Sequence, residues 1–107
     1  MAGQLIQLTD ENFQNTIASG ITLVDFYATW CGPCRMVAPI FEQLAGMLDG
    51  KAKIAKLDID QAPQTAESLQ ITSVPTIILF KDGKEEKKVV GVKELDFLLN
   101  LVQSYQK

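Results

Sequence analysis

The sequence contains no histidine and only two cysteines, Cys31 and Cys34, among its 107 residues. A structural zinc site takes four protein ligands, most often cysteine and histidine. One copy of the chain can therefore supply only half of such a site. We predict no metal bound by a single chain. A zinc ion shared between two copies, which would make dimerisation depend on metal, stays as an alternative interpretation.

Positive charge and long apolar runs are also scarce. The net charge is −3, from 10 lysines and arginines against 13 aspartates and glutamates, so no basic patch for nucleic acid is expected. No apolar run approaches the roughly 18–20 residues that span a bilayer. The first four residues, Met1 to Gln4, lack the charged and apolar regions of a signal peptide. These absences predict a cytoplasmic protein that binds neither nucleic acid nor membrane.

The composition is that of one small soluble domain. Hydrophobic residues make up 47% and charged residues 21% of the chain, which is ordinary for a globular protein. We therefore predict a single domain over residues 1–107. In a reducing cytosol, a lone cysteine pair is more often catalytic or metal-binding than structural.

Hydrophobic periodicity predicts strands that alternate with helices. The strands are expected near residues 5–8, 21–28, 52–57, 76–80 and 87–90, and the helices after Thr9-Asp10, from Cys34 to about residue 48, near residues 62–69 and over about 93–105. Pro39 is expected to kink the second helix near Arg35. The alternation predicts parallel crossovers, and the Asp82-Gly83 turn predicts an antiparallel hairpin. The fold class is therefore α/β, with a mixed central sheet and helices on both faces.

The two cysteines lie where a buried strand is followed by a helix. Residues three apart on a helix have Cβ atoms about 5–6 Å apart, so a small adjustment of the first turn brings them to the distance of a disulfide. The free N–H groups and the dipole of a helix N-terminus stabilise a thiolate. Cys31 precedes the helix and is expected to be the more exposed sulfur and to attack. Cys34 is expected to be shielded and to resolve the intermediate.

Asp25 is an ionisable residue in a strand whose other residues are typical of a buried one. Burial disfavours a carboxylate, so the pKa of Asp25 should be raised. The strand-to-helix geometry places Asp25 below the cysteine turn, where it could take the proton from Cys34. The alternative is a core aspartate neutralised by a cation such as Lys56. Lys56 could also serve in both interpretations, by pairing with Asp25 and by shifting the pKa of its carboxyl group.

Val74-Pro75 and Trp30 are each open to two interpretations. Pro75 at the start of a strand is most simply trans, because a proline there can just mark where the strand begins. A cis bond would instead turn the backbone of Val74 outward, free to pair with an extended peptide. Trp30, next to the first sulfur, belongs either to the core or to the rim of the site.

The stretch Trp30-Cys-Gly-Pro-Cys34 on a strand–helix junction resembles the active site of the thioredoxin family. The resemblance covers nearly the whole chain, and its landmarks follow in order at similar spacing. These landmarks are Val24 to Pro39, Lys56 to Asp60, Val74-Pro-Thr76, Phe80 to Gly83 and Val90-Gly91. The resemblance implies the thioredoxin fold, a five-stranded mixed central sheet flanked by four helices.

The resemblance also implies roles by position. Cys31 corresponds to the attacking cysteine, Cys34 to the resolving one, Asp25 to a buried aspartate and Lys56 to the lysine beside it. Pro75 matches a cis proline that faces the disulfide, which reverses the interpretation from the residues alone. The implied substrate-binding surface, an apolar patch that docks partner proteins, comprises Trp30, Gly32, Pro33, Val74, Pro75 and Gly91.

The implied function is the reduction of disulfides in target proteins through a reversible Cys31–Cys34 dithiol. The resemblance implies re-reduction by NADPH through thioredoxin reductase and no bound cofactor, and the chain itself contains no Gly-x-Gly-x-x-Gly nucleotide motif. We expect a monomer whose partners are the reductase and disulfide-containing proteins. The alternative is a non-enzymatic module that docks partners around Trp30 and Val74. Such a module would keep its function with both cysteines replaced by serine.

Three stretches depart from the family pattern. Gln70 stands where the family usually has glycine before Ile71, so a positive φ there would strain the backbone. Ser73 lies beside the active surface at a variable position, and it bears on partner choice more than on activity. The segment from Gly91 to the last helix offers no Ser, Thr or Asp cap, so the sequence does not fix where that helix begins.

Overall fold

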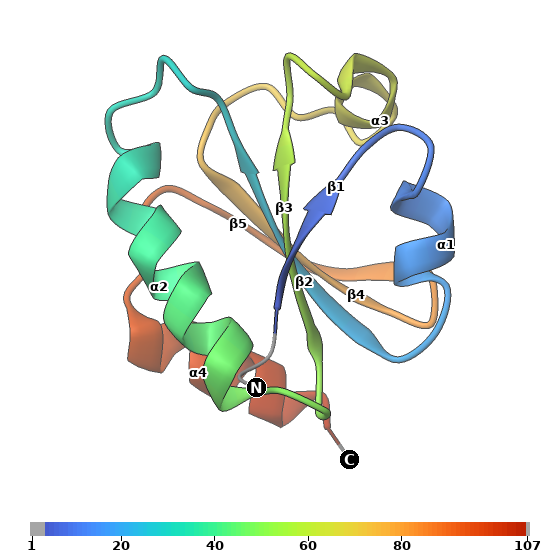
Figure 1. Cartoon of the computed structure of the whole chain (residues 1–107), viewed down its shortest axis with the longest axis vertical. Helices are drawn as coiled ribbons and strands as arrows, with labels where there is room; N and C mark the ends of the chain where they lie inside the picture. The colour runs from blue at the N-terminus through green and yellow to red at the C-terminus, as the bar shows by residue number, and fades with distance from the viewer. Residues whose placement is uncertain (1–3, 107) are drawn as a thin grey trace.

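The computed structural model describes residues 4–106, which form one five-stranded sheet and four helices (Figure 1). In chain order the elements are β1 (Leu5–Leu8), α1 (Phe13–Ile17), β2 (Ile21–Tyr27), α2 (Cys34–Met47), β3 (Lys53–Asp58), α3 (Pro63–Ser68), β4 (Thr76–Lys81), β5 (Lys84–Val90) and α4 (Leu95–Ser104). Their number and order confirm the predicted architecture. Within residues 4–106, no helix is long and apolar enough to cross a membrane.

The sheet is mixed, as predicted, with the strand order β1-β3-β2-β4-β5. β1, β3 and β2 are parallel, whereas β4 is antiparallel to β2 and to β5. A two-residue turn joins β4 to β5, and its residues Asp82 and Gly83 have φ values of 51° and 86°. Positive φ at both positions is characteristic of the type I′ hairpin turn, which explains the Asp-Gly sequence.

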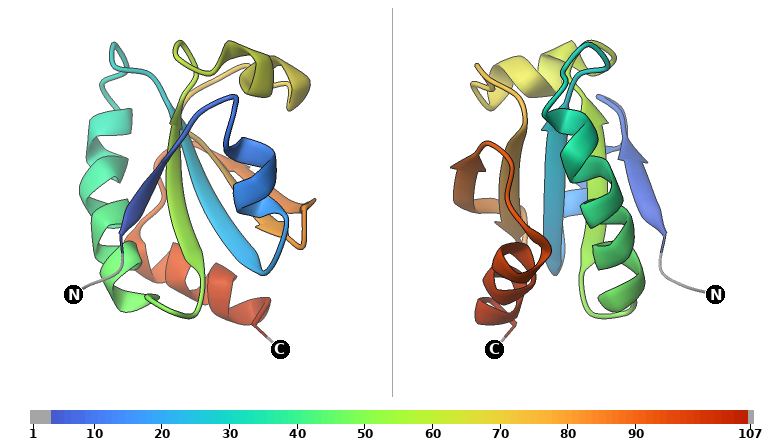
Figure 2. Two further views of the ribbon diagram at one scale, coloured as in Figure 1. Left: turned by 45° about the vertical axis from the view of Figure 1, so that its right-hand side comes forward. Right: turned by 90° about the vertical axis from the view of Figure 1, so that its left-hand side faces the viewer.

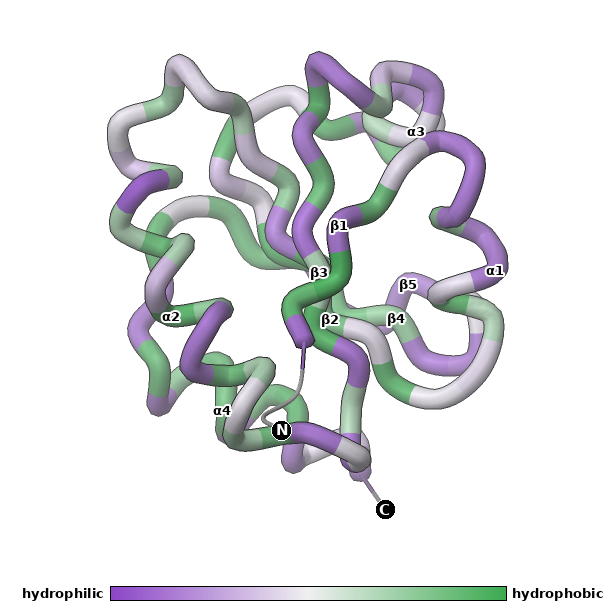
Figure 3. Tube along the Cα trace, viewed as in Figure 1, coloured by the Kyte–Doolittle hydropathy of each residue, from purple (hydrophilic) through white to green (hydrophobic). Residues whose placement is uncertain are grey.

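Helices cover both faces of the sheet (Figures 1 and 2). Successive side chains of β2 point to opposite faces of the sheet, so the core is divided in two. Leu23 packs with Phe41 of α2 and Leu98 of α4 on one face. Val24 packs with Phe13 of α1 on the other face. Figure 3 shows hydrophobic residues mainly along the central strands and hydrophilic ones in the outer turns. Asp25 follows Val24 on β2 and therefore lies on the α2 face.

The ends of several elements differ from the prediction. Helix α1 begins only at Phe13, and Asp10 caps another helix, because its carboxylate accepts hydrogen bonds from the backbone N–H groups of Gln64 and Thr65 in α3. Helix α4 begins at Leu95 after Glu94, which makes no side-chain capping hydrogen bond. The cap of α3 depends on a contact between segments that are distant in sequence, which periodicity does not report.

Helix α2 runs continuously through Pro39. Pro39 has no N–H, so it leaves the carbonyl of Arg35 without its usual helical donor. The kink expected at this point stays a prediction.

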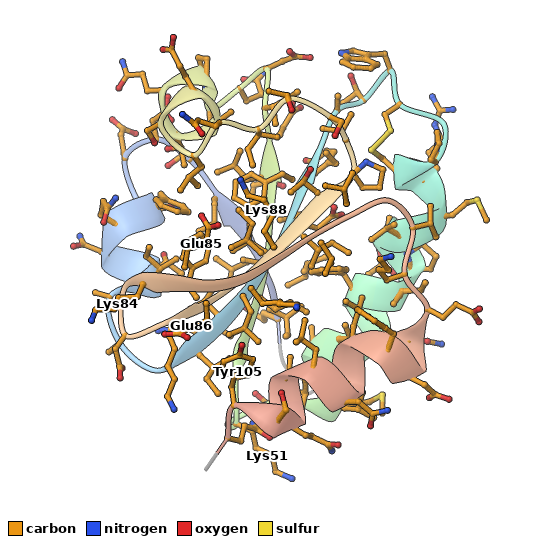
Figure 4. The ribbon with its side chains drawn as sticks, turned by 180° about the vertical axis from the view of Figure 1, so that it is seen from behind. Lys51, Lys84, Glu85, Glu86, Lys88 and Tyr105 are labelled. Atoms are coloured by element: carbon orange, nitrogen blue, oxygen red, sulfur yellow. A yellow bond between two sulfur atoms is a disulfide. The ribbon has the colours of Figure 1, made fainter. Side chains whose placement is uncertain are left out.

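Strand β5 is longer than predicted and forms one edge of the sheet. The prediction began at residue 87, but pairing with β4 extends from Lys84 to Val90. Charged residues are poor strand formers in isolation, so the hairpin register decides their conformation. Its first five residues are all exposed, and Figure 4 shows Lys84, Glu85, Glu86 and Lys88 along this strand.

Candidate functional site

Cys31 and Cys34 form a disulfide between the loop after β2 and the first residue of α2, with their Cα atoms 5.4 Å apart. The backbone N–H of Cys34 lies 3.2 Å from Sγ of Cys31 and donates to it. This N–H belongs to the free amides at the start of the helix, so it would stabilise negative charge on Cys31 after reduction. This hydrogen bond favours a thiolate on the first cysteine rather than on the second.

The predicted difference in exposure between the two cysteines is wrong for this disulfide state. Cys31 is 5% exposed and Cys34 is 4% exposed. The loop at Val74 explains the burial of Cys31. The Val74 carbonyl oxygen lies 3.8 Å from Cys31 Sγ, and the Val74 side chain packs against the cluster that contains both cysteines. The two cysteines differ instead in their neighbours, since Cys34 lines a partly open cavity that Cys31 does not line.

That cavity, of about 230 Å³, lies between α2 and the sheet and is lined by Asp25, Cys34, Lys56, Arg35, Tyr27 and Phe41, among others. Asp25 is 3% exposed, and its Oδ1 has no hydrogen-bond partner among the described residues. Burial raises the pKa of Asp25 to about 7, and the positive charge of Lys56 partly opposes this rise. The raised pKa agrees with the expectation from the sequence.

Lys56 lies directly opposite Asp25, because the two residues are paired in the parallel register of β2 and β3. Its ammonium lies over the ring of Tyr27, 5.9 Å from the ring centroid. The other cation of the cavity, Arg35, donates a hydrogen bond to the carbonyl of Thr29 at 3.2 Å. A buried carboxylate, the second cysteine and two cations therefore line one cavity.

The Val74–Pro75 peptide bond is cis. The resemblance implies this conformation, and the trans interpretation from the residues alone is wrong. The Pro75 carbonyl accepts a hydrogen bond from the N–H of Gly91 at 2.8 Å, which joins this loop to the end of β5. Gly91 has a φ of 97°, a conformation that favours glycine.

Trp30 lies on the rim of the site and is 66% exposed, which excludes the core interpretation. Its indole N–H donates to Oδ2 of Asp60 at 3.0 Å. Gly32 and Pro33 are also exposed, and Gly91 is half-buried. Sequence reasoning gave Asp60 no role; the signal it missed is that an exposed indole N–H calls for an acceptor nearby.

The departures from the family pattern have different structural contexts. Gln70 has a φ of 56°, so the left-handed conformation suspected from the sequence is present at a residue with a side chain. Ser73 is exposed, and its carbonyl accepts a hydrogen bond from the hydroxyl of Thr76 at 2.6 Å. Within residues 4–106, no group of three or more His, Cys, Asp or Glu side chains is placed to hold a metal ion.

The site therefore joins a reversible disulfide, a helix N-terminus and a buried carboxylate at one end of the sheet. Residues 4–104 match the family model described as Thioredoxin. The chain is 50% identical over 101 residues to the thioredoxin of Staphylococcus saprophyticus and to that of Staphylococcus haemolyticus, covering 94% of this chain and 97% of each relative.

Two solved thioredoxin structures have a similar fold. The fold resembles that of a mutant thioredoxin from Halobacterium salinarum NRC-1, with a TM-score of 0.90, 34% identity and coverage of 100% of this chain and 96% of the other. It also resembles the thioredoxin of Malassezia sympodialis, with a TM-score of 0.87, 29% identity and coverage of 98% and 93%.

Proposed function

Because the chain belongs to the thioredoxin family, it is a protein-disulfide reductase, and we propose that Cys31 attacks the target disulfide and Cys34 resolves the intermediate. The observation that carries this assignment is the hydrogen bond from the Cys34 N–H to Cys31 Sγ at 3.2 Å. It favours a thiolate on Cys31 in the reduced protein, and the thiolate is the reactive form of cysteine.

The reaction proceeds by two exchanges. The Cys31 thiolate attacks one sulfur of the target disulfide, the target S–S bond breaks, and the released target sulfur leaves as a thiolate that takes up a proton. The Cys34 thiolate then attacks Cys31, the mixed disulfide breaks, and the second target sulfur leaves in the same way. Two electrons pass from the dithiol to the target, and the Cys31–Cys34 disulfide forms.

Asp25 is proposed to accept the proton of Cys34 before the second exchange. Both residues line the same cavity, and the Oδ1 atom of Asp25 is free of hydrogen bonds among the described residues. A base whose pKa is about 7 is well matched to proton transfer near neutral pH. Lys56, opposite Asp25 in the register, stabilises the carboxylate form.

Targets are proposed to dock on Trp30, Gly32, Pro33, Val74, Pro75 and Gly91. Exposed Trp30 and the exposed turn between the cysteines supply apolar area next to the reacting sulfur. Val74 and Gly91 are half-buried and Pro75 is buried, and the hydrogen bond from Gly91 to Pro75 holds the two segments together beside this surface.

The wider setting is also proposed from family membership. The disulfide would be re-reduced by NADPH through thioredoxin reductase, and the protein itself would bind no cofactor. We propose a cytoplasmic monomer whose residues 1–107 form a single domain, with disulfide-containing proteins as partners and no role in binding nucleic acid or membrane.

The test is insulin disulfide reduction by a limiting small dithiol, with the wild-type chain, Cys31→Ser and Cys34→Ser. Wild type should accelerate the reaction, and Cys31→Ser should lose the acceleration. Cys34→Ser should instead accumulate a mixed disulfide with the target, visible by mass spectrometry. If Cys34→Ser stays free while Cys31→Ser forms the adduct, the assignment of the two roles is reversed. If the folded wild type shows no acceleration, a docking module becomes the better description.

A further inference from the structure

Tyr27 is the last residue of β2, half-buried beside the cavity that contains Asp25 and Cys34. The Lys56 ammonium lies 5.9 Å from its ring centroid, within the range of a cation–π contact. A lysine side chain is long and flexible, and without a contact for its ammonium it extends this charge into water. The ring therefore lies where it can hold this charge near the cavity.

The position of the ring is itself supported by neighbouring strands. The Tyr27 hydroxyl lies 3.5 Å from Oε1 of Gln7 on β1, a long and weak hydrogen bond. The side-chain amide of Gln7 also donates to the backbone carbonyl of Lys56 at 3.4 Å. Gln7 thus connects Tyr27 and Lys56 across three adjacent strands.

We propose that Tyr27 is a positioning residue for the reaction, whose ring face holds the Lys56 ammonium beside Asp25 so that the carboxylate form can accept the Cys34 proton. This inference rests on the role proposed above for Asp25. Tyr27 also packs against the cluster of Ala28, Cys31 and Cys34, but its proposed effect on the reaction is exerted through Lys56.

Other groups around Asp25 do not take over this function. From α2, Cys34 and Arg35 face the cavity, but the Arg35 guanidinium is bonded to the Thr29 carbonyl. Asp58, two residues after Lys56 on β3, accepts a hydrogen bond from the backbone N–H of Asp60. On its other side Asp25 pairs with the apolar residue Ile77 of β4. Lys56 is therefore the charge that Tyr27 can direct.

The test compares Tyr27→Leu, which removes the aromatic face, with Tyr27→Phe, which keeps the ring and loses only the hydroxyl. Carbon-13 NMR of the Asp25 carboxyl in the reduced protein gives its pKa. A second readout is the pH dependence of release of a coloured aromatic thiol from a preformed mixed disulfide on Cys31, which follows attack by Cys34. Thermal unfolding of each variant confirms that it is folded.

Tyr27→Leu should raise the Asp25 pKa by roughly half a unit, and the release profile should move to higher pH by the same amount. Tyr27→Phe keeps the ring and loses only the long, weak hydrogen bond to Gln7, so it should stay close to the wild-type value. In a Lys56→Met background, Tyr27→Leu should cause no further shift. Equal Asp25 pKa values in Tyr27→Leu and Tyr27→Phe would overturn the positioning role. A shift that persists in the Lys56→Met background would also overturn it, because it would show that Tyr27→Leu acts through a change in burial alone.

Failure of the Asp25 role is separable from failure of the Tyr27 role. In Asp25→Asn, the proposed base is absent, so the release profile should lose its dependence on that pKa. An unchanged profile in Asp25→Asn would reject Asp25 as the base. The NMR titration of Asp25 in the Tyr27 variants would still decide whether the ring positions Lys56.

Discussion

Asp10, in the turn that follows β1, accepts hydrogen bonds from both the backbone N–H and the hydroxyl of Thr65, at 2.8 and 2.7 Å, across 55 residues of sequence. Thr65 lies in the first turn of α3, where backbone N–H groups lack helical acceptors. The carboxylate of the segment that joins β1 to α1 therefore caps α3, which lies much later in the sequence. The local cap predicted by Thr9-Asp10 is only half correct, since Thr9 Oγ1 accepts a hydrogen bond from the Asn12 N–H before α1.

Asp10→Ala should therefore lower the urea midpoint of unfolding at pH 7. The hydrogen bond from the Thr65 hydroxyl holds the pKa of Asp10 below its ordinary value of 3.8. A lowered pKa in the folded state means that the stabilisation is present above about pH 4 and is lost as the pH falls through the folded-state value. Glu11→Ala, at the exposed neighbouring position, is the matched control. An equal loss for Asp10→Ala at pH 7 and at pH 2 would contradict a role for the carboxylate charge.

Asp25→Asn should stabilise the fold, and more at high pH. Burial raises the Asp25 pKa from 3.8 to about 7, so the folded protein binds the proton more tightly than the unfolded chain. Stability is therefore full below about pH 4 and falls as the pH rises towards 7. Above pH 7 the penalty is constant and on the order of 4 kcal/mol at most, at about 1.4 kcal/mol per pKa unit.

Urea unfolding of wild type and Asp25→Asn between pH 4 and pH 9 measures this difference. The curves should converge near pH 4 and separate up to about pH 7, with Asn the more stable variant. Parallel curves over the whole range would show that the Asp25 pKa is not raised in the fold.

Gln70→Gly should also stabilise the protein. Gln70 has a φ of 56°, a conformation that costs a side-chain-bearing residue roughly 1–2 kcal/mol. Glycine removes that cost, although its greater freedom in the unfolded chain cancels about 0.4–1 kcal/mol. The net gain should be about 1 kcal/mol. Gln70→Ala keeps a Cβ at the strained position and serves as the control, so thermal unfolding should rank Gly above both Ala and wild type.

Trp30→Ala should weaken reduction of protein disulfides more than reduction of small ones. Loss of a large exposed aromatic ring at a docking surface typically costs 1–2 kcal/mol, or roughly 5–30-fold in kcat/KM. Hydroxyethyl disulfide is too small to cover the docking surface as a protein does, so its reduction should change less than twofold. Asp60→Ala frees the indole N–H and should give a smaller loss of the same kind. Equal losses on both substrates would place Trp30 in the chemistry rather than in docking.

Local patterns predicted most of this structure, and several of the failures share a physical cause. The alternation of β2, the Asp82-Gly83 turn and the Cys31–Cys34 spacing each depend on neighbours along the chain, and each was predicted correctly. The burial of Cys31 depends on a loop 43 residues away at Val74. The cap of α3 and the acceptor for Trp30 likewise come from distant segments, and a single sequence gives no signal for such pairs.

Strand β5 has a consequence for how copies of the protein meet in concentrated solution. It is an edge of the sheet, and an edge offers unpaired N–H and C=O groups to any passing strand. Five consecutive exposed charged residues occupy this strand, from Lys84 to Lys88. A second β5 added at the edge would need to desolvate both sets of charges, so the sheet ends here instead of propagating into a fibre.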